Sequence, residues 1–301
     1  MSYNEWEKNK RNNLISIAVT IVLLAIIVVL VILLIKKQQN EPQPQPSASR
    51  EPSVSGMPET SARETPTPSL QGTPPESGVP TAEPTPAAEY NYAQPVPQSR
   101  QVDLEYFKDA VFIGDSRMED FAAFSGIAKY ATFYTHIGMT VNHLITEEEN
   151  KIIRFKINGE NLTLEEAFRK YSDFSKVYIM LGYNELGWPY PEQFINYYVK
   201  VLNLIKSVRP DVKIYVECVI PVARQITGIG VDPKMENNQN IAVFNRYIQG
   251  MCEEQKVYYL NVQEALVDGE GYLPDGAASD GIHLKKEYCL KWLEYIRSHV
   301  V

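Results

Sequence analysis

The last 200 residues of the chain alternate between short apolar runs and longer segments with helical periodicity. Strands that are separated in sequence by helices form parallel sheets, with the helices packed on the sheet faces. The alternation therefore predicts an α/β fold for residues 102–301, in the form of a three-layer α/β/α sandwich. The expected strands lie at 110–113, 130–134, 176–181, 213–219 and 257–261, and the expected helices at 118–124, 141–145, 164–171, 191–208, 240–255 and 285–299.

A short insertion at residues 152–161 departs from this alternation. It places the pair Asn158-Gly159 between two short stretches that contain apolar residues. Asn-Gly favours the tight turn of a two-residue hairpin, because both residues tolerate a positive φ. We expect a small hairpin here, outside the main sheet.

The N-terminal part of the chain contains a long uncharged stretch. From Leu14 to Ile35 it runs for 22 residues, enough for a helix to cross the hydrocarbon layer of a bilayer. The alternative is a cleavable signal peptide, but the stretch is longer than the usual apolar region and meets Lys36-Lys37 rather than a small-residue cleavage site. We expect a transmembrane helix at 14–35, in contact with a lipid bilayer. The distribution of positive charges around this helix favours a cytoplasmic N-terminus at 1–13.

A proline-rich segment separates this span from the α/β region. Residues 38–101 hold 14 of the 20 prolines and almost no large aliphatic side chains. Such a composition cannot bury enough apolar surface to fold, so a disordered linker is expected at 36–101. Fully extended, it would reach about 200 Å at ~3.1 Å per residue. A stalk of this length suits a single-pass protein with an extracellular C-terminal domain in the cell wall of a Gram-positive bacterium.

Charge and metal-ligand patterns exclude several classes of function. Residues 102–301 contain 28 acidic and 21 basic residues, dispersed along the segment, so nucleic acid is not an expected partner. The four histidines do not have the spacing of a zinc site, and no metal or cofactor is expected. The cysteines show no CxxC pattern and are predicted to be buried free thiols: Cys218, Cys252 and Cys289.

The chemistry-bearing residues lie at opposite ends of the α/β region. Gly114-Asp115-Ser116 directly follows the first expected strand, and Asp280-Gly-Ile-His283 precedes the last expected helix. A serine hydroxyl becomes a nucleophile when a neighbouring imidazole takes its proton, and a carboxylate can orient that imidazole. The pattern predicts a catalytic triad of Ser116, His283 and Asp280. A strand-ending turn in which Asp115 or Ser116 only caps the next helix is the alternative.

With these two motifs the sequence resembles the SGNH (GDSL) hydrolase family over nearly all of residues 108–300. Two further family blocks follow the second and third strands: Thr135-His-Ile-Gly138 and Gly182-Tyr-Asn184-Glu185. The resemblance implies a flavodoxin-like five-stranded parallel sheet and an oxyanion hole formed by Ser116, Gly138 and Asn184. Glu185 departs from the family pattern, in which an Asp is usual.

Four residues beside these blocks are candidate substrate contacts. Arg117 follows the nucleophile and could meet a polar or anionic group, although a surface arginine on a helix is the plainer interpretation. Tyr183 and Trp188, which cluster with Tyr190 beside Asn184, could form an apolar platform for a sugar ring with it, or pack in the core. Glu185 completes the set.

The combination of site, anchor and stalk leads to one functional expectation. It is an extracellular, membrane-tethered serine esterase that removes small acyl groups, O-acetyl above all, from cell-surface carbohydrate through an acyl-enzyme. An O-acyltransferase that passes the acyl group to another glycan hydroxyl would use the same residues. A non-catalytic wall-binding module of the same fold is the third alternative.

Overall fold

The computed structural model describes residues 90–228 and 230–301. The predicted cytoplasmic segment 1–13, the predicted transmembrane helix 14–35 and most of the predicted linker 36–101 lie outside the described residues. Within the described part of the chain, no helix combines the length and apolarity needed to cross a bilayer.

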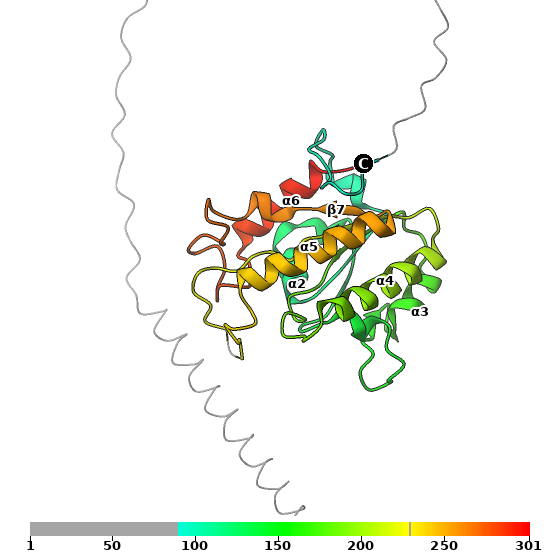
Figure 1. Ribbon diagram of the computed structural model, residues 1–301. Coiled ribbons are helices and arrows are strands. Elements are labelled where there is room, and N and C mark those ends of the chain that lie inside the picture. The colour runs from blue at the N-terminus through cyan, green and yellow to red at the C-terminus, as the bar shows by residue number, and fades with distance from the viewer. Residues whose placement is uncertain (1–89, 229) are drawn as a thin grey trace, which may run out of the picture. The chain divides into compact units, whose positions relative to one another are not determined.

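A parallel sheet forms the centre of this part of the chain (Figure 1). Its five strands have the order β2-β1-β5-β6-β7, which is the flavodoxin-like order, and all neighbouring pairs are parallel. The five expected strands and the α/β fold class are confirmed. The strand bounds are β1 (Ala110–Gly114), β2 (Thr132–Thr135), β5 (Lys176–Met180), β6 (Lys213–Glu217) and β7 (Tyr258–Leu260).

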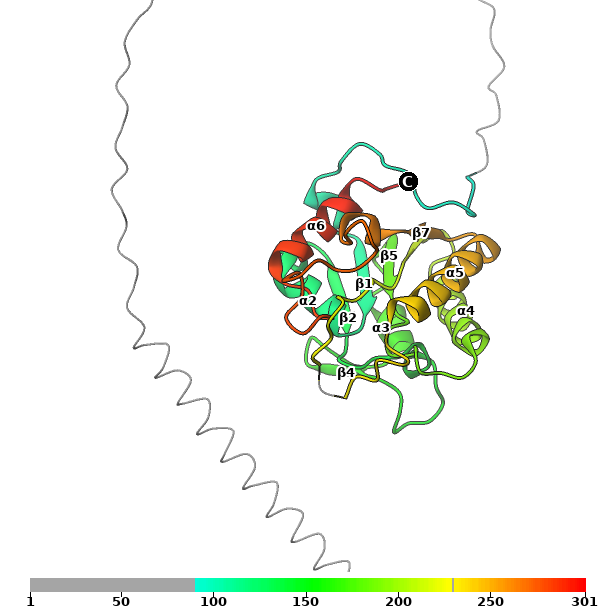
Figure 2. The same ribbon diagram turned by 60° about the vertical axis from the view of Figure 1, so that its left-hand side comes forward.

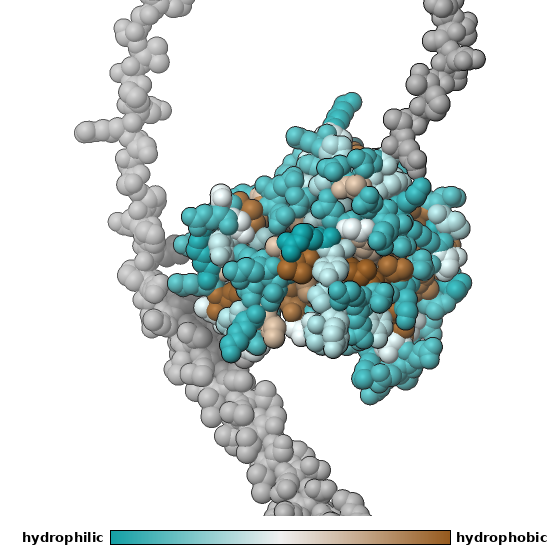
Figure 3. Space-filling model, in the orientation of Figure 1, coloured by the Kyte–Doolittle hydropathy of each residue, from teal (hydrophilic) through white to brown (hydrophobic). Residues whose placement is uncertain are grey.

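Helices cover both faces of the sheet, as Figure 2 shows. On one face α2 (Ser116–Ser125) packs against α6 (Lys286–Arg297), and on the other α3 (Leu164–Lys170), α4 (Pro191–Val208) and α5 (Asn238–Gln255) lie side by side. The outer face that carries α4 and α5 is mostly hydrophilic, with hydrophobic residues in small patches (Figure 3). Short 3-10 helices complete the described part: η1 (Leu104–Phe107), η2 (Ile127–Lys129), η3 (Val141–Leu144) and η4 (Val262–Ala265).

The predicted hairpin is present as β3 (Phe155–Ile157) and β4 (Glu160–Leu162), which form a separate antiparallel pair. Asn158 and Gly159 at its turn have φ values of 49° and 88°. Two consecutive positive φ angles are what the favoured two-residue hairpin turn requires, which explains the Asn-Gly pair.

One aromatic side chain from each strand forms a ladder across the sheet. Phe133, Phe112, Tyr178, Tyr215 and Tyr258 stand in register, and neighbouring ring centroids are 4.6–5.1 Å apart. Stacked cross-strand aromatic pairs stabilise one register over its alternatives. The register aligns the carboxyl ends of β1, β2 and β5, and ligand sites in open α/β sheets form at this edge.

The packed domain begins before the expected boundary at residue 102. Val96 is buried, and its backbone N–H donates a hydrogen bond of 2.9 Å to the carbonyl of Tyr259. Tyr90 packs edge to face on Tyr258, with ring centroids 5.0 Å apart. The last residues assigned to the linker therefore belong to the domain, because their few apolar side chains cover the β7 edge of the sheet.

Candidate active site

Ser116 is the first residue of α2 and stands two residues beyond the end of β1. The turn between them needs Gly114, since a Cβ there would lie 2.5 Å from the Cβ of Met118 and 2.9 Å from the carbonyl oxygen of Met180. Asp115 caps the helix by accepting a hydrogen bond of 3.0 Å from the backbone N–H of Arg117. These local constraints present the Ser116 hydroxyl at the start of a helix, where backbone N–H groups lack helical acceptors.

The structure brings Ser116, His283 and Asp280 into one hydrogen-bonded chain. His283 Nε2 lies 2.9 Å from Ser116 Oγ, and His283 Nδ1 lies 2.7 Å from Asp280 Oδ2. The other carboxylate oxygen of Asp280 accepts hydrogen bonds from the backbone N–H groups of Ile282 and His283, at 2.9 and 2.8 Å. The imidazole therefore stands between a hydroxyl and a carboxylate that is itself held by the backbone of the same loop.

The carboxyl of Asp280 remains ionised over the range in which an esterase would work. Partial burial opposes its ionisation, but hydrogen bonds from His283 and Ile282 outweigh burial and lower the pKa of Asp280 to about 2. A permanently charged carboxylate can orient the imidazole and stabilise the cation that forms when His283 takes a proton from Ser116.

Gly138 and Asn184, the other two predicted oxyanion donors, lie at the ends of the strands that flank β1. Gly138 has a φ of 69° and is exposed. The side-chain amide of Asn184 donates to the carbonyl of Met139 at 3.0 Å and to Asp115 Oδ2 at 3.1 Å. Both amide hydrogens of Asn184 are thus engaged, so donation to an oxyanion requires one of these contacts to lengthen.

Glu185 was expected to contact substrate, and this prediction is wrong. Its side chain is 0% exposed, and its Oε1 accepts a hydrogen bond of 2.6 Å from the backbone N–H of Val141. Burial raises the pKa of Glu185 to about 8, so the carboxyl is largely neutral at pH 7. The residue fastens the loop that carries Gly138 to the loop that carries Asn184.

The expectation of a substrate contact is also wrong for Arg117, which is 1% exposed. Its guanidinium donates a hydrogen bond of 2.5 Å to the carbonyl of Ile220 and lies 4.5 Å from the ring centroid of Tyr183. Tyr183 is itself buried, and its hydroxyl donates to Glu236 Oε2 at 2.7 Å. Arg117 and Tyr183 are therefore packed inside the domain rather than available to a substrate.

The aromatic side chains near Asn184 differ in their exposure. Trp188 is half-buried and packs edge to face on Tyr197, with ring centroids 6.0 Å apart. Tyr190 is 66% exposed, and Ile137, next to Gly138, is 70% exposed. An apolar surface for a substrate at this edge would therefore be formed by Trp188, Tyr190 and Ile137 rather than by Tyr183.

Two further carboxyl groups lie near the triad, Asp115, which was expected only as a possible helix cap, and Asp120, which was not singled out from the sequence. Asp115 is buried, and desolvation raises its pKa. Asp120 lies one helical turn after Ser116, and burial, together with the negative charge of Asp280, raises its pKa to about 6. The four-residue spacing from Ser116 on α2 places Asp120 on the same helix face, which is the signal that could have found it.

The described residues also test the expectations for cysteines and metal ligands. Cys218, Cys252 and Cys289 are buried and free, as predicted. Among residues 90–228 and 230–301, no group of three or more His, Cys, Asp or Glu side chains is arranged to hold a metal ion.

Comparison with known proteins identifies one matching family model. The model of the GDSL-like lipase/acylhydrolase family matches residues 112–287, which include Ser116, Gly138, Asn184, Asp280 and His283. A search of curated proteins gives no significant match.

Several solved structures have a similar fold at low sequence identity. A Streptococcus pneumonia structure is 18% identical, with 64% of this chain and 83% of that chain covered and a TM-score of 0.49. A GDSL-like lipase from Bacteroides thetaiotaomicron is 16% identical, with 69% and 90% covered and a TM-score of 0.45. A carbohydrate acetylesterase from Sinorhizobium meliloti is 16% identical, with 63% and 97% covered and a TM-score of 0.41.

Proposed function

Because the chain belongs to the GDSL-like lipase/acylhydrolase family and is an ester-hydrolysing serine hydrolase, we propose that it removes small acyl groups, O-acetyl above all, from cell-surface carbohydrate. The observation that carries the catalytic part is the hydrogen-bonded chain from Ser116 through His283 to Asp280. The anchor predicted at 14–35 and the proline-rich stalk after it support an extracellular, membrane-tethered location and hence a surface glycan as substrate.

The geometry supports a two-step mechanism. His283 Nε2 takes the proton of Ser116 Oγ as the oxygen attacks the ester carbonyl, and it then returns that proton to the departing sugar hydroxyl. In the second step His283 deprotonates a water molecule that attacks the acyl carbon, and it returns that proton to Ser116 Oγ as the bond to the acyl group breaks and the acid leaves. Asp280 stays ionised throughout and holds Nδ1–H of the imidazole.

Charge that builds on the carbonyl oxygen needs donors in place before the reaction. The backbone N–H groups of Ser116 and Gly138 and the side chain of Asn184 are the proposed donors, from the ends of three adjacent strands. The contact of Asn184 with Met139 couples two of them, because it ties the strand-end loops after β5 and β2 together.

Turnover of acetyl esters by the full-length chain in detergent tests the catalytic part. We expect release of acetate from 4-nitrophenyl acetate and from O-acetylated wall glycan, and loss of at least 1000-fold in kcat in Ser116→Ala. Equal rates for wild type and Ser116→Ala would contradict the proposal. Transfer of the acetyl group to an added glycan in place of acetate release would show the transferase alternative.

Labelling of intact cells tests the proposed location. The native cysteines are buried, so a new cysteine at Ser53→Cys in the proline-rich segment should be the main site for a membrane-impermeant maleimide. We expect labelling without lysis for Ser53→Cys and none for a cysteine at Ser2→Cys. The reverse pattern would place the domain in the cytoplasm.

A further inference from the structure

A cavity of about 860 Å³ lies beside the triad, lined by the segment after β6, the first turns of α5 and the loop around Tyr272. This volume is within the range of small-molecule sites in proteins. The mechanism described above uses none of its side chains. Its position at the carboxyl edge of the sheet is where ligands of open α/β proteins bind.

The cavity and the triad share one wall. The backbone N–H of Ala223 donates to the carbonyl of Gly281 at 2.9 Å, and that of Thr227 donates to the carbonyl of Asp280 at 2.8 Å. The segment from Ala223 to Thr227 therefore lies directly against the loop that carries Asp280, while its residues also line the cavity. Glu236, another lining residue, accepts the hydrogen bond from Tyr183 next to Asn184.

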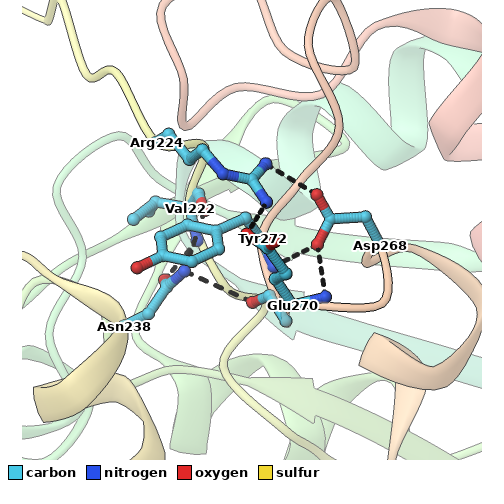
Figure 4. Close-up of polar contacts among 7 residues, drawn as sticks. Val222, Arg224, Asn238, Asp268, Glu270 and Tyr272 are labelled. Atoms are coloured by element: carbon cyan, nitrogen blue, oxygen red, sulfur yellow. Dashed lines mark hydrogen bonds and ion pairs between the residues drawn. The ribbon is translucent and has the colours of Figure 1, made fainter.

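Hydrogen bonds hold the rim of the cavity in shape. Figure 4 shows Asn238 beside Val222. The side-chain oxygen of Asn238 accepts a hydrogen bond of 2.7 Å from the backbone N–H of Val222, and its side-chain amide donates one of 3.0 Å to the carbonyl of Val222. The same Asn238 amide donates to the carbonyl of Gly271 at 3.3 Å. One side chain thus links α5 to both loops of the rim, which makes this a preformed site.

Charged groups at the cavity are already paired. Arg224 forms ion pairs of 2.6 Å with both Asp268 and Glu270, and its guanidinium lies 4.6 Å from the ring centroid of Tyr272 (Figure 4). The carboxylate oxygens of Glu236 accept hydrogen bonds from Tyr183 and from the backbone N–H of Asp232. Among the described residues that line the cavity there is no unpaired cation, and carboxylates outnumber cations, so the cavity disfavours an anionic ligand.

The polar groups that remain available are uncharged. Gln225, Thr227 and Gln239 are exposed lining residues, and among the described residues their side chains form no hydrogen bond. Amide and hydroxyl groups beside a tyrosine ring are suited to a ligand with many hydroxyls and an apolar ring face. A neutral sugar has this combination.

We propose that the cavity binds a neutral sugar residue of the glycan substrate. This sugar lies further along the glycan than the acetylated sugar whose ester is attacked by Ser116. This rests on the proposed carbohydrate substrate. Since the wall from Ala223 to Thr227 separates the cavity from the triad, a glycan must extend over that wall to occupy both. Longer oligosaccharides are therefore better substrates than short ones.

Filling the cavity tests the proposal. Gln239→Trp places a large side chain at its α5 wall, and Gln193→Trp, at an exposed position of α4 that does not line it, is the matched control. For O-acetylated tetrasaccharides, we expect kcat/KM to fall at least 10-fold in Gln239→Trp and to stay unchanged in Gln193→Trp. Turnover of 4-nitrophenyl acetate should be unchanged in both. Equal rates of wild type and Gln239→Trp on the tetrasaccharides would overturn the proposal.

Binding without chemistry separates this proposal from the proposed function. Calorimetry on Ser116→Ala, with and without Gln239→Trp, would use chitotetraose, cellotetraose, xylotetraose and the anionic tetragalacturonate. We expect at least one neutral tetrasaccharide to bind, tetragalacturonate not to bind, and Gln239→Trp to raise the Kd at least 10-fold. Binding without any esterase activity would sink the proposed function alone. Esterase activity with no tetrasaccharide binding, or with binding that Gln239→Trp leaves unchanged, would overturn the cavity proposal alone.

Discussion

The buried carboxyl of Glu185 accepts a hydrogen bond of 2.6 Å from the backbone N–H of Val141, across 44 residues of sequence. Val141 lies three residues after Gly138, and Glu185 directly follows Asn184. A neutral carboxyl group, together with the contact of Asn184 with Met139, therefore sets the relative position of two proposed oxyanion donors. The arrangement makes both the stability of the domain and the geometry of its site sensitive to the state of Glu185.

Glu185→Gln is expected to change the pH dependence of stability. Burial raises the pKa of Glu185 to about 8 from its ordinary value of 4.5, so its stabilising contribution is complete below about pH 4.5 and is lost as pH rises towards 8. The loss has a slope of up to about 1.4 kcal/mol per pH unit. Urea unfolding between pH 5 and 9 should show a flatter profile for Glu185→Gln than for wild type.

Glu217→Gln is a second test of this effect and a comparison for activity. Glu217 is also 0% exposed, burial raises its pKa to about 8, and it accepts a hydrogen bond of 2.6 Å from the indole N–H of Trp292. Both substitutions should flatten the stability profile. The alanine variant Glu185→Ala deletes the acceptor for Val141 and should therefore reduce kcat as well, whereas Glu217→Gln should not. An equal kcat in wild type and Glu185→Ala would contradict a positioning role for Glu185.

Asn184→Ala is expected to reduce kcat by 100- to 1000-fold with little change in KM. The reason is that an oxyanion donor acts on the transition state, and removing one costs about 3 to 4 kcal/mol. Steady-state kinetics on 4-nitrophenyl acetate measures the effect. A change in KM alone would assign Asn184 to substrate binding.

Gly138→Ala should lower both stability and activity, because Gly138 has a φ of 69°, a conformation that costs an alanine about 1 kcal/mol. A Cβ at this position meets no atom within 4 Å, so the effect is one of the backbone alone. Gly126→Ala is the matched control, since Gly126 has a φ of 82° and equally open surroundings but lies at the far end of α2. Thermal unfolding should show similar losses in both variants, and esterase assays a loss of kcat in Gly138→Ala only.

Asp280→Asn is expected to reduce kcat by about 100- to 10,000-fold while the domain remains folded. The amide cannot hold the imidazole of His283 in the same tautomer or stabilise its cation. The backbone N–H groups of Ile282 and His283 retain an acceptor in the asparagine side-chain oxygen. Activity measured beside circular dichroism separates the two effects, and wild-type activity in Asp280→Asn would remove Asp280 from the triad.

Local patterns in the sequence were sufficient for much of the fold. Each expected strand coincides with an observed one to within a few residues, because runs of β-branched and aromatic side chains are buried wherever the sheet forms. The Asn158-Gly159 turn follows from the φ preferences of two neighbouring residues. The contact of Asp280 with His283 is equally local, since only two residues lie between them and one of these, Gly281, has a left-handed conformation with a φ of 91° that closes the loop.

Only the tertiary structure decided the roles of residues whose partners are distant in sequence. Arg117 is next to the nucleophile, but it is buried because its guanidinium meets the carbonyl of Ile220, 103 residues away. Glu185 is next to the proposed amide donor and yet is enclosed by the loop of Val141. Local spacing determines strands, turns and the order of motifs, whereas the burial of a charge depends on which distant segments pack around it. The sequence by itself thus determined the fold class and predicted the three residues that form the hydrogen-bonded chain from Ser116 to Asp280, and the packing decided which of their neighbours are exposed.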